Sequence, residues 1–425
     1  MGLEEVEARA AIARLIPVEV EEVAEVLARA GFRAWAVGGG VRDAILAGCL
    51  GRDVVPGDWD LATDALPLQV KPLFRRVIPT GIAHGTVTVL HKGSSFEVTT
   101  LRGEEGHSDG RRPDSVFFVS EIEKDLARRD FTVNAIAYDL KDKTIADPFG
   151  GIQDLEQGII RAVGDPAARY QEDGLRPLRA ARFSAQLEMS LEEGTRAAIR
   201  PSLERFSRVS VERVQAEWFK ALRSRCPSRC FRILLEDGLL QVTCPALFAA
   251  PPREPIEAIW ARLDGAAPNP VRRLAHLLYD GLSLPEKELP DTLDRLRLSN
   301  HDRNEVVGLV AAMSLPEELS AEAVRKWLSA RGRALAPSAL AFAQERGAPE
   351  SFLTLATEEL KSGVPLAVVE LAISGKDLID AQVVEKGPRV RALLFSLLSH
   401  TFAHPEDNDP NRLLALAREL ARAER

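Results

Sequence analysis

The pattern of apolar residues changes near Asp154, and this change restricts the chain to a mixed part followed by a helical part. Before Asp154, short runs rich in β-branched residues predict strands mixed with helices, one of them over Val41–Ala47. After it, Arg, Leu, Ala and Glu dominate, and apolar residues recur at intervals of three and four, as in helices. We therefore predict an α+β fold with an all-helical remainder. The predicted strands are Ala34–Val37, Trp59–Ala62, Thr86–Leu90 and Phe96–Leu101, and Asp125–Leu140 is predicted to be a helix that runs into a strand.

The composition is that of a globular protein with several domains. A chain of 425 residues is too long for one compact core and suits about two to four domains. It has no run of ~18 apolar residues, and its first ten residues lack a basic region followed by an apolar core. The four cysteines are scattered and form no zinc-binding set. We expect a cytoplasmic protein with no membrane partner, and we infer no protein partner.

The charge is unevenly distributed along the chain. Between Arg169 and Arg232 there are thirteen Arg and one Lys against eight acids, a net of +6, while the whole chain carries −8 and the remainder therefore −14. A basic segment within an acidic protein is typical of a surface that binds phosphates. A solvated, salt-bridged helical face fits this charge pattern equally well.

A triple glycine separates the first predicted strand from the helix that follows it. Gly38–Gly40 would let backbone N–H groups approach a bound group closely, and the start of a helix favours an anion. Arg42 adds a planar guanidinium suited to phosphate oxygens. Taken alone, such a run of glycines is more often an ordinary turn.

Two carboxylates, Asp58 and Asp60, stand two residues apart in a strand-like stretch, so we expect their side chains on one face. Carboxylates side by side repel one another unless a cation lies between them, and oxygen ligands of this kind suit Mg²⁺. Glu97, in a neighbouring predicted strand, is the candidate for a third carboxylate. Taken alone, a pair of aspartates with this spacing is more often two exposed surface acids.

Two further segments are polar. Arg102–Pro113 is rich in glycine and charge and is predicted to be a mobile loop. Arg128–Ala135 contains two Arg, an Asp and an Asn, which can hold phosphates and read hydroxyls. An ordinary ion-paired helix would explain the second segment as well.

Together these segments resemble the family of tRNA nucleotidyltransferases and poly(A) polymerases, in the class found in bacteria and eukaryotes. Five motifs occur in the family's order across about residues 35–183, and a weaker one follows near residue 210. They are Gly38–Asp43, Asp58–Asp60, Arg128–Ala135, Asp147–Leu155 and Glu172–Arg176 continuing through Arg179 to Phe183, with Ser210–Arg213 as the weaker one. The resemblance fades beyond about residue 240.

The resemblance implies a polymerase-β-like nucleotidyltransferase head followed by an all-helical neck, body and tail. The implied domains are a catalytic head at 1–150, a base-recognising neck at 151–240, a body at 241–330 and a tail at 331–425 that contacts tRNA. It also implies that Gly39 and Arg42 contact the triphosphate of the incoming nucleotide. Asp58 and Asp60 would bind Mg²⁺, as two ions, with Glu97 completing the catalytic set.

The resemblance gives the remaining site residues roles in nucleotide binding. Arg129 and Asp130 would meet the ribose and phosphates, and Asp173 and Arg176 would form hydrogen bonds with the base in place of a template strand. Arg179 and Arg182 would support that pair and reach the triphosphate.

The spacing of the neck residues makes independent physical sense. Arg176, Arg179 and, less closely, Arg182 follow Asp173 at steps of three, which would place them in one stripe on a helix. An acid beside a guanidinium matches the amine and ring nitrogen that cytosine and adenine share. Pro177 departs from the expected motif, because proline inside a helix costs about 3 kcal/mol. The helix is therefore expected to begin late or to bend there.

Our hypothesis from the sequence is an enzyme that adds CCA to the tRNA 3′ end, with tRNA as partner and CTP and ATP as substrates. The alternatives are an enzyme that adds only CC or only A, a poly(A) polymerase, and an RNA-binding protein without activity. The stretch Val77–Thr86 looks like the CCA-adding type, and His84 within it is expected to be structural. The intact pair Asp58 and Asp60 argues against an inactive protein.

Overall fold

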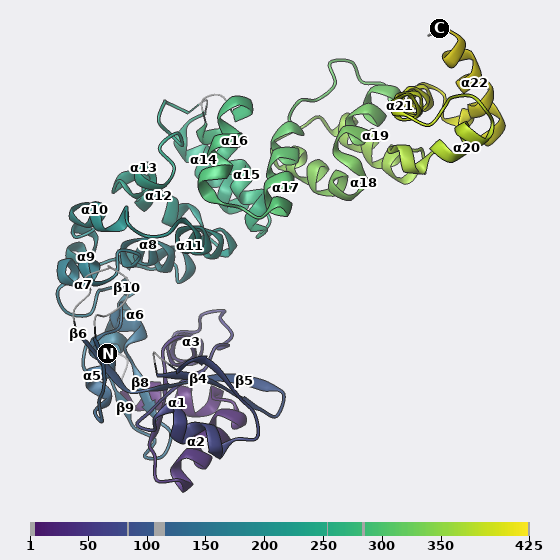
Figure 1. Ribbon diagram of the computed structural model, residues 1–425. Coiled ribbons are helices and arrows are strands. Elements are labelled where there is room, and N and C mark those ends of the chain that lie inside the picture. Colours follow the sequence, from purple (N-terminus) through teal and green to yellow (C-terminus); the bar gives the residue numbers. More distant parts are fainter. Residues whose placement is uncertain (1–4, 83–84, 106–114, 253, 283–284, 424–425) are drawn as a thin grey trace. The chain divides into compact units, whose positions relative to one another are not determined.

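The computed structural model describes residues 5–82, 85–105, 115–252, 254–282 and 285–423 (Figure 1). The chain divides into two compact units, Met1–Pro245 and Ala246–Arg425. In the described ranges no helix is long and apolar enough to cross a membrane.

A seven-stranded mixed sheet forms the centre of the first part of unit Met1–Pro245. Its strand order is β3-β4-β5-β2-β1-β8-β9, in which β2 and β5 are parallel and the other neighbours are antiparallel. The strands are β1 (Ala34–Val37), β2 (Asp60–Thr63), β3 (Val77–Gly81), β4 (Thr86–His91), β5 (Ser94–Thr100), β8 (Ala137–Asp139) and β9 (Ile145–Ala146).

Successive side chains of β1 enter two different cores, as expected for a strand buried on both faces. Ala34 and Ala36 pack in a core with residues of the first three helices, whereas Trp35 and Val37 pack with Ile122 and other residues on the opposite side. The helices on or near the sheet are α1 (Glu5–Leu15), α2 (Val18–Arg29), α3 (Gly39–Gly48), α4 (Pro67–Val70) and α5 (Ile122–Ala127), with the short 3₁₀ turns η1 (Lys71–Leu73) and η3 (Thr132–Asn134).

The four predicted strands and the predicted helix after the triple glycine are confirmed, with ends that move by one or two residues. The prediction for Asp125–Leu140 is wrong in part, because helix α5 ends at Ala127. The Asp130 carboxylate accepts the N–H of Phe131 at 2.9 Å, and Thr132 N–H donates to the Arg161 carbonyl at 2.9 Å. These bonds take the backbone donors that a continuing helix would use.

The predicted loop Arg102–Pro113 is shorter than expected. Its first residues form strand β6 (Arg102–Glu105), which pairs in antiparallel fashion with β7 (Ser115–Phe118). The loop prediction for residues 106–113 lies outside the described residues, and so does the prediction for His84.

The second part of unit Met1–Pro245 is helical, apart from a two-residue parallel pair of strands, β10 and β11. This agrees with the predicted change near Asp154. The elements are α6 (Gly151–Gln157), β10 (Ile159–Ile160), α7 (Pro166–Glu172), α8 (Arg176–Gln186), β11 (Ser190–Leu191), α9 (Glu193–Ala197), η4 (Arg200–Ser202), α10 (Leu203–Phe206), α11 (Val211–Arg223), α12 (Ser228–Glu236) and α13 (Leu239–Thr243).

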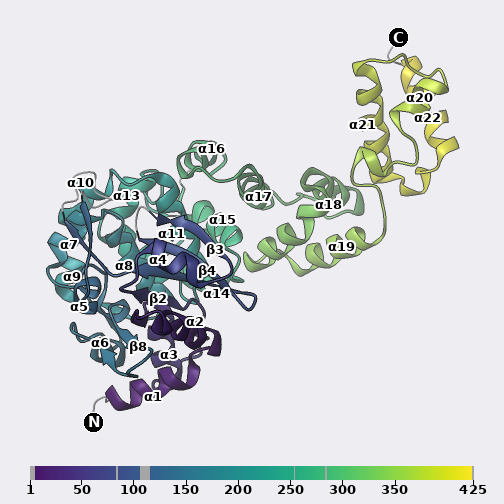
Figure 2. The ribbon, with the colours of Figure 1, turned by 60° about the horizontal axis from the view of Figure 1, so that its bottom comes forward.

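Unit Ala246–Arg425 is helical wherever the structure describes regular elements (Figure 2). Its last helices share a core made mostly of leucines. Its element α18 consists of two helical segments that meet in a kink at Gly332, whose φ is 72°. The elements are α14 (Ile256–Gly265), α15 (Pro270–Gly281), α16 (Pro285–Leu296), α17 (Asn300–Ala311), α18 (Ala321–Glu345), α19 (Glu350–Lys361), η5 (Val368–Glu370), α20 (Gly375–Asp380), α21 (Pro388–Ala403), η6 (Pro405–Asp407) and α22 (Pro410–Ala423).

Candidate functional site

The glycine turn brings the start of α3 against the segment that carries the two aspartates. Gly40 N–H donates to the Asp58 carbonyl at 3.1 Å, and a Cβ at Gly40 would lie 2.7 Å from the Trp59 ring and 3.0 Å from that carbonyl oxygen. Gly38 has a φ of 76°, which favours glycine. The turn also brings Gly39 near Arg42, since a Cβ at Gly39 would lie 3.7 Å from Arg42 Nη2. Glycine is thus required for the close approach of the two segments.

We predict that Gly40→Ala reduces the activity proposed below by at least about tenfold and destabilises the protein by about 1–3 kcal/mol, because the added methyl must displace the Trp59 ring or the Asp58 carbonyl. The measurements are the rate of nucleotide addition and the melting temperature. Gly57→Ala is the matched control, since its Cβ would come no closer than 4.0 Å to its nearest neighbour. Equal behaviour of the two variants would contradict the proposed packing.

Asp58, Asp60 and Glu97 lie near one another at adjacent strands. Asp60 opens β2, and the parallel register that pairs Leu61 with Val98 sets Asp60 beside Glu97. Burial and then the Glu97 carboxylate raise the pKa of Asp60 to about 6, with Asp58 adding to this shift and Arg129 opposing it. The prediction that both aspartates lie in one strand is wrong, because Asp58 precedes β2. The Asp58 carbonyl accepts a hydrogen bond from the N–H of Gly40, which is not part of a strand.

The carboxylate group fits a cation in charge and in ligand chemistry. In the described part of the chain, no three His, Cys, Asp or Glu side chains are already close enough to enclose a metal ion. The pKa of Asp60 is nevertheless raised, first by burial and then by repulsion from Glu97 and Asp58, so its negative charge is unfavourable there. A bound cation would relieve this repulsion, and carboxylate oxygens suit a hard ion such as Mg²⁺.

Arg129 lies beside the carboxylates and is held there by a buried acid that the sequence analysis missed. A Cβ at Gly38 would lie 3.2 Å from Arg129 Nη1 and 3.6 Å from Asp60 Oδ2. Asp125, whose side chain is 1% exposed, accepts from Arg129 Nη2 at 3.4 Å and from Arg128 Nη2 at 2.7 Å. Burial alone would raise the pKa of Asp125, but the two guanidinium groups outweigh it and lower that pKa. Arg128 and Arg129 follow Asp125 by three and four residues, and this spacing in the sequence was the signal that could have identified Asp125.

Asp130 joins the sheet part of the unit to helix α8. Its Oδ2 accepts from Arg179 Nε at 2.7 Å and Nη2 at 2.6 Å, across 49 residues of sequence. Burial would raise its pKa, but the guanidinium groups of Arg179 and Arg176 outweigh this effect and lower the pKa of Asp130 to about 2. Asp130 is therefore ionised at neutral pH, and the pair fixes Arg179.

Helix α8 begins at Arg176, so Pro177 lies in its first turn. Arg176 N–H donates to the Asp173 carbonyl at 3.0 Å, and Arg179 N–H donates to the Leu175 carbonyl at 3.0 Å. Proline is tolerated between them, because the first N–H groups of a helix have no partner one turn earlier within the helix. This confirms the expectation of a late helix start. The alignment of Asp173 on the same helix is wrong, because Asp173 lies in the short connection before α8. The connection turns where Gly174 packs against Arg205, since a Cβ there would lie 2.7 Å from the Arg205 carbonyl oxygen.

Asp173 and Arg176 each have partners other than one another. Arg176 Nη1 donates to Glu172 at 2.5 Å and Nη2 to the Arg128 carbonyl at 3.0 Å. Asp173 accepts from the Leu175 N–H at 3.0 Å and from Arg213 Nη2 at 2.7 Å. Arg213 belongs to the weak sixth motif, and its contact with Asp173 spans 40 residues.

Three guanidinium groups surround the Phe183 ring, which the sequence analysis did not assign to the site. Arg182 lies 3.7 Å from the ring centroid, and Arg179 and Arg42 lie at 5.4 and 5.5 Å. Arg42 also donates to Asn134 Oδ1 at 2.6 Å. Because cations are attracted to the face of an aromatic ring, Phe183 stabilises guanidinium groups from both the sheet part and the helical part of the unit.

Glu217, also missed, neutralises part of this charge from helix α11. Its carboxylate accepts from Arg182 Nε, and its Oε1 lies 3.9 Å from Arg179 Nη1. Burial would raise the pKa of Glu217, but Arg182, Arg179 and Lys220 together lower it. The site as a whole sets carboxylates suited to metal next to several guanidinium groups suited to a polyphosphate.

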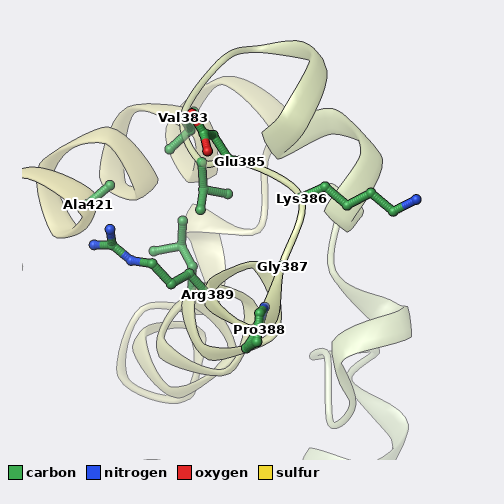
Figure 3. A pocket seen from close by; sticks show the side chains of 9 residues that line it. Val383, Glu385, Lys386, Gly387, Pro388, Arg389 and Ala421 are labelled. Carbon is green, nitrogen blue, oxygen red and sulfur yellow. The ribbon is translucent and has the colours of Figure 1, made fainter.

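A separate cavity of about 370 Å³ lies in unit Ala246–Arg425, where the segment before α21, the start of α21 and the end of α22 line it (Figure 3). Its charged lining residues are Glu385, Lys386 and Arg389, and the Lys386 side chain points away from the other side chains shown. None of the residues predicted for the site lies in this cavity.

Three family models match successive parts of the chain. A "Poly A polymerase head domain" matches residues 34–161, a "Probable RNA and SrmB- binding site of polymerase A" matches residues 188–250, and a "tRNA nucleotidyltransferase domain 2" matches residues 272–417.

Whole-length relatives and solved structures agree with these matches. The CCA-adding enzyme of Limosilactobacillus fermentum is 35% identical over 418 residues, 96% of this chain and 99% of the relative. That of Lactiplantibacillus plantarum is 34% identical over 405 residues, 94% and 95% of the two chains. The crystal structure of the Bacillus stearothermophilus CCA-adding enzyme with CTP has a TM-score of 0.78 and 31% identity, covering 96% of this chain and 98% of that one. The Thermotoga maritima enzyme with tRNA shares the fold, at a TM-score of 0.64 and 19% identity over 98% of each chain.

Proposed function

The chain belongs to the family of CCA-adding enzymes, and from that premise we propose that it adds C, C and A to the 3′ end of tRNA from CTP and ATP. The observation that carries the proposal is the 35% identity to a CCA-adding enzyme across 96% of the chain. Each addition joins the tRNA 3′-hydroxyl to the α-phosphate of the nucleotide and releases pyrophosphate. The base order comes from the protein, without a template strand.

The enzymes of this family are nucleotidyltransferases that generally depend on a metal ion. We assign Asp58 and Asp60 here as the ligands of two Mg²⁺ ions, with Glu97 as the third catalytic carboxylate. When bound, the ions would activate the attacking hydroxyl and stabilise the leaving pyrophosphate. The proximity of Asp60 to Glu97 and the raised pKa of Asp60 support this assignment.

The triphosphate and ribose of the nucleotide would be held by residues from both parts of unit Met1–Pro245. We assign Gly39 and Arg42 to the triphosphate, and Arg129 and Asp130 to the ribose and phosphates. Two observations support these roles. Arg129 lies next to Asp60, and Arg42 lies in the first turn of helix α3, at the glycine turn. Arg179 and Arg182 would support base reading and extend to the triphosphate, since both lie around the Phe183 ring with Arg42.

The base would be read by Asp173 and Arg176. A carboxylate accepts from the exocyclic amine and a guanidinium donates to the ring nitrogen, a pattern that cytosine and adenine share and that uracil and guanine lack. Arg176 has its Nη2 on the Arg128 carbonyl, next to Arg129 in sequence. This contact would hold Arg176 at a fixed position relative to the segment that binds the phosphates.

The domain assignments stay proposals: a catalytic head at 1–150, a base-recognising neck at 151–240, a body at 241–330 and a tail at 331–425 that contacts tRNA. The family models match residues 34–161, 188–250 and 272–417, and the third of them spans the proposed boundary between body and tail. We also propose the cytoplasm as the site of action, because tRNA is the substrate.

The proposal is tested with tRNA that ends at the discriminator base, at C or at CC, each supplied with single nucleotides and Mg²⁺. We expect C to be added to the first two substrates, A to the third, and CCA to be completed when CTP and ATP are both present. Addition that stops after CC, or A addition alone, would identify an enzyme of partial activity. Long A tails would indicate a poly(A) polymerase, and no incorporation would refute the proposal.

A further inference from the structure

Helix α11 carries two charged side chains, one turn apart, that reach the proposed nucleotide-binding residues. Arg213 donates to Asp173 Oδ2 at 2.7 Å, and Glu217 accepts from Arg182 and lies near Arg179. Residues four apart share one face of a helix. One face of α11 therefore contacts both Asp173, which we propose to bind the base, and the arginines Arg179 and Arg182.

Asp173 depends on Arg213 because the local chain does not fix its side chain. It follows the last residue of α7 and precedes α8, with extended backbone angles (φ −135°, ψ 110°). Its own segment provides one donor, the Leu175 N–H, and the other donor comes from Arg213. The Asp173 side chain is 19% exposed, so it keeps access to a ligand.

The position of Arg213 is unfavourable for the helix to which it belongs. It is the third residue of α11, and a cation in the first turn of a helix is opposed by the helix dipole. The ion pair with Asp173 offsets this cost. The carboxylate oxygens of Asp173 offer hydrogen-bond acceptors to a ligand, and the contact with Arg213 fixes where they lie.

We propose that Arg213 is a specificity-determining positioning residue, which fixes the Asp173 carboxylate so that it accepts from an amine and repels a carbonyl. The inference rests on the proposed function of Asp173 as base reader. A fixed carboxylate meets the amine of cytosine or adenine favourably and the O4 oxygen of uracil unfavourably. Without Arg213 the carboxylate can turn away, and the penalty against uracil is lost.

The experiment compares kcat/KM for CTP and UTP with tRNA that ends at the discriminator base, for the wild-type protein and Arg213→Met. We expect the CTP:UTP ratio to fall by about tenfold or more in the variant, because specificity of this kind depends on how firmly the polar groups of the site are held. The loss should appear mainly as a higher KM for CTP, with an unchanged or better rate for UTP. Arg213→Lys should give an intermediate ratio, since one ammonium donor replaces part of the guanidinium contact.

Arg208→Met is the matched control, because Arg208 forms a similar ion pair, with Glu204 at 2.6 Å, on an exposed part of the same region. Its CTP:UTP ratio should equal that of the wild type. An unchanged ratio in Arg213→Met, or an equal loss for both nucleotides, overturns the inference. If that variant does not fold, Arg213→Lys decides, and a ratio equal to that of the wild type overturns the inference. A wild-type protein that adds neither C nor A would instead refute the proposed function.

Discussion

Asp60→Asn is expected to abolish nucleotide addition and at the same time to stabilise the metal-free protein at pH 8. The activity should fall by more than ~100-fold, since even residues that only support metal ligands contribute about 10- to 100-fold. The stability should rise because the pKa of Asp60 is raised from 3.8 to about 6, mainly by burial. Activity on tRNA ending at CC and melting temperature without metal are the two measurements.

The sign of the pH effect follows from the direction of the pKa shift. A carboxyl group whose folded-state pKa is raised contributes stability that is fully present below about pH 4 and is lost as the pH rises through about 6. The ionised form then costs up to about 3 kcal/mol at pH 8, and asparagine removes that cost. The gain of the variant should therefore shrink at pH 5.

Magnesium provides the internal control for this prediction. Mg²⁺ should raise the melting temperature of the wild type, which binds it when folded, and should affect Asp60→Asn much less. Asp53→Asn, at an exposed acid in the same segment, should change neither activity nor stability. Full activity of Asp60→Asn would show that Asp60 is not a metal ligand.

Asp130→Ala should lower the free energy of unfolding of unit Met1–Pro245 by about 3 kcal/mol, because it leaves the Arg179 guanidinium, whose side chain is only 29% exposed, without its main partner. We expect the lower end of the usual range, since Glu217 lies 3.9 Å from Arg179 Nη1 and still offsets its charge. The pKa of Asp130 is lowered to about 2, so the stability from the pair is present above about pH 4 and is lost as the pH falls through about 2. The difference between variant and wild type should shrink in acid.

Urea unfolding of the full chain, followed by tryptophan fluorescence, measures this loss. A double-mutant cycle with Arg179→Ala should return a coupling energy between the two side chains, because they are in direct contact. Glu204→Ala, which breaks the exposed pair with Arg208, is the control and should leave the transition unchanged. Additive effects of Asp130→Ala and Arg179→Ala would contradict the coupling.

The sequence predicted what depends on near neighbours along the chain. The strand Ala34–Val37, the glycine turn and the helix after it follow from local pattern, and the structure has all three. The break after Ala127 was missed because the Asp130 side chain and the Arg161 carbonyl, which end the helix, act through contacts that no periodicity reveals.

The site residues that the sequence did not predict were missed for the same physical reason. Glu217 reaches the site through its bond to Arg182, 35 positions away, and Phe183 reaches it through the packing of its ring against Arg182, Arg179 and Arg42. Asp173 was assigned to a helix because its spacing to Arg176 is helical, and only the close packing of Gly174 on Arg205 shows why the chain turns there. The roles of the site residues stay predictions until the variants are measured.

The contact of Gly40 with Trp59 has an evolutionary consequence. The indole occupies the space that any side chain at position 40 would need, at 2.7 Å from a hypothetical Cβ. A mutation at either position alone therefore creates a clash or a void beside Asp58 and Asp60. Over generations the two positions should change together or remain as they are, so this pair limits the paths by which descendants of this protein can diverge.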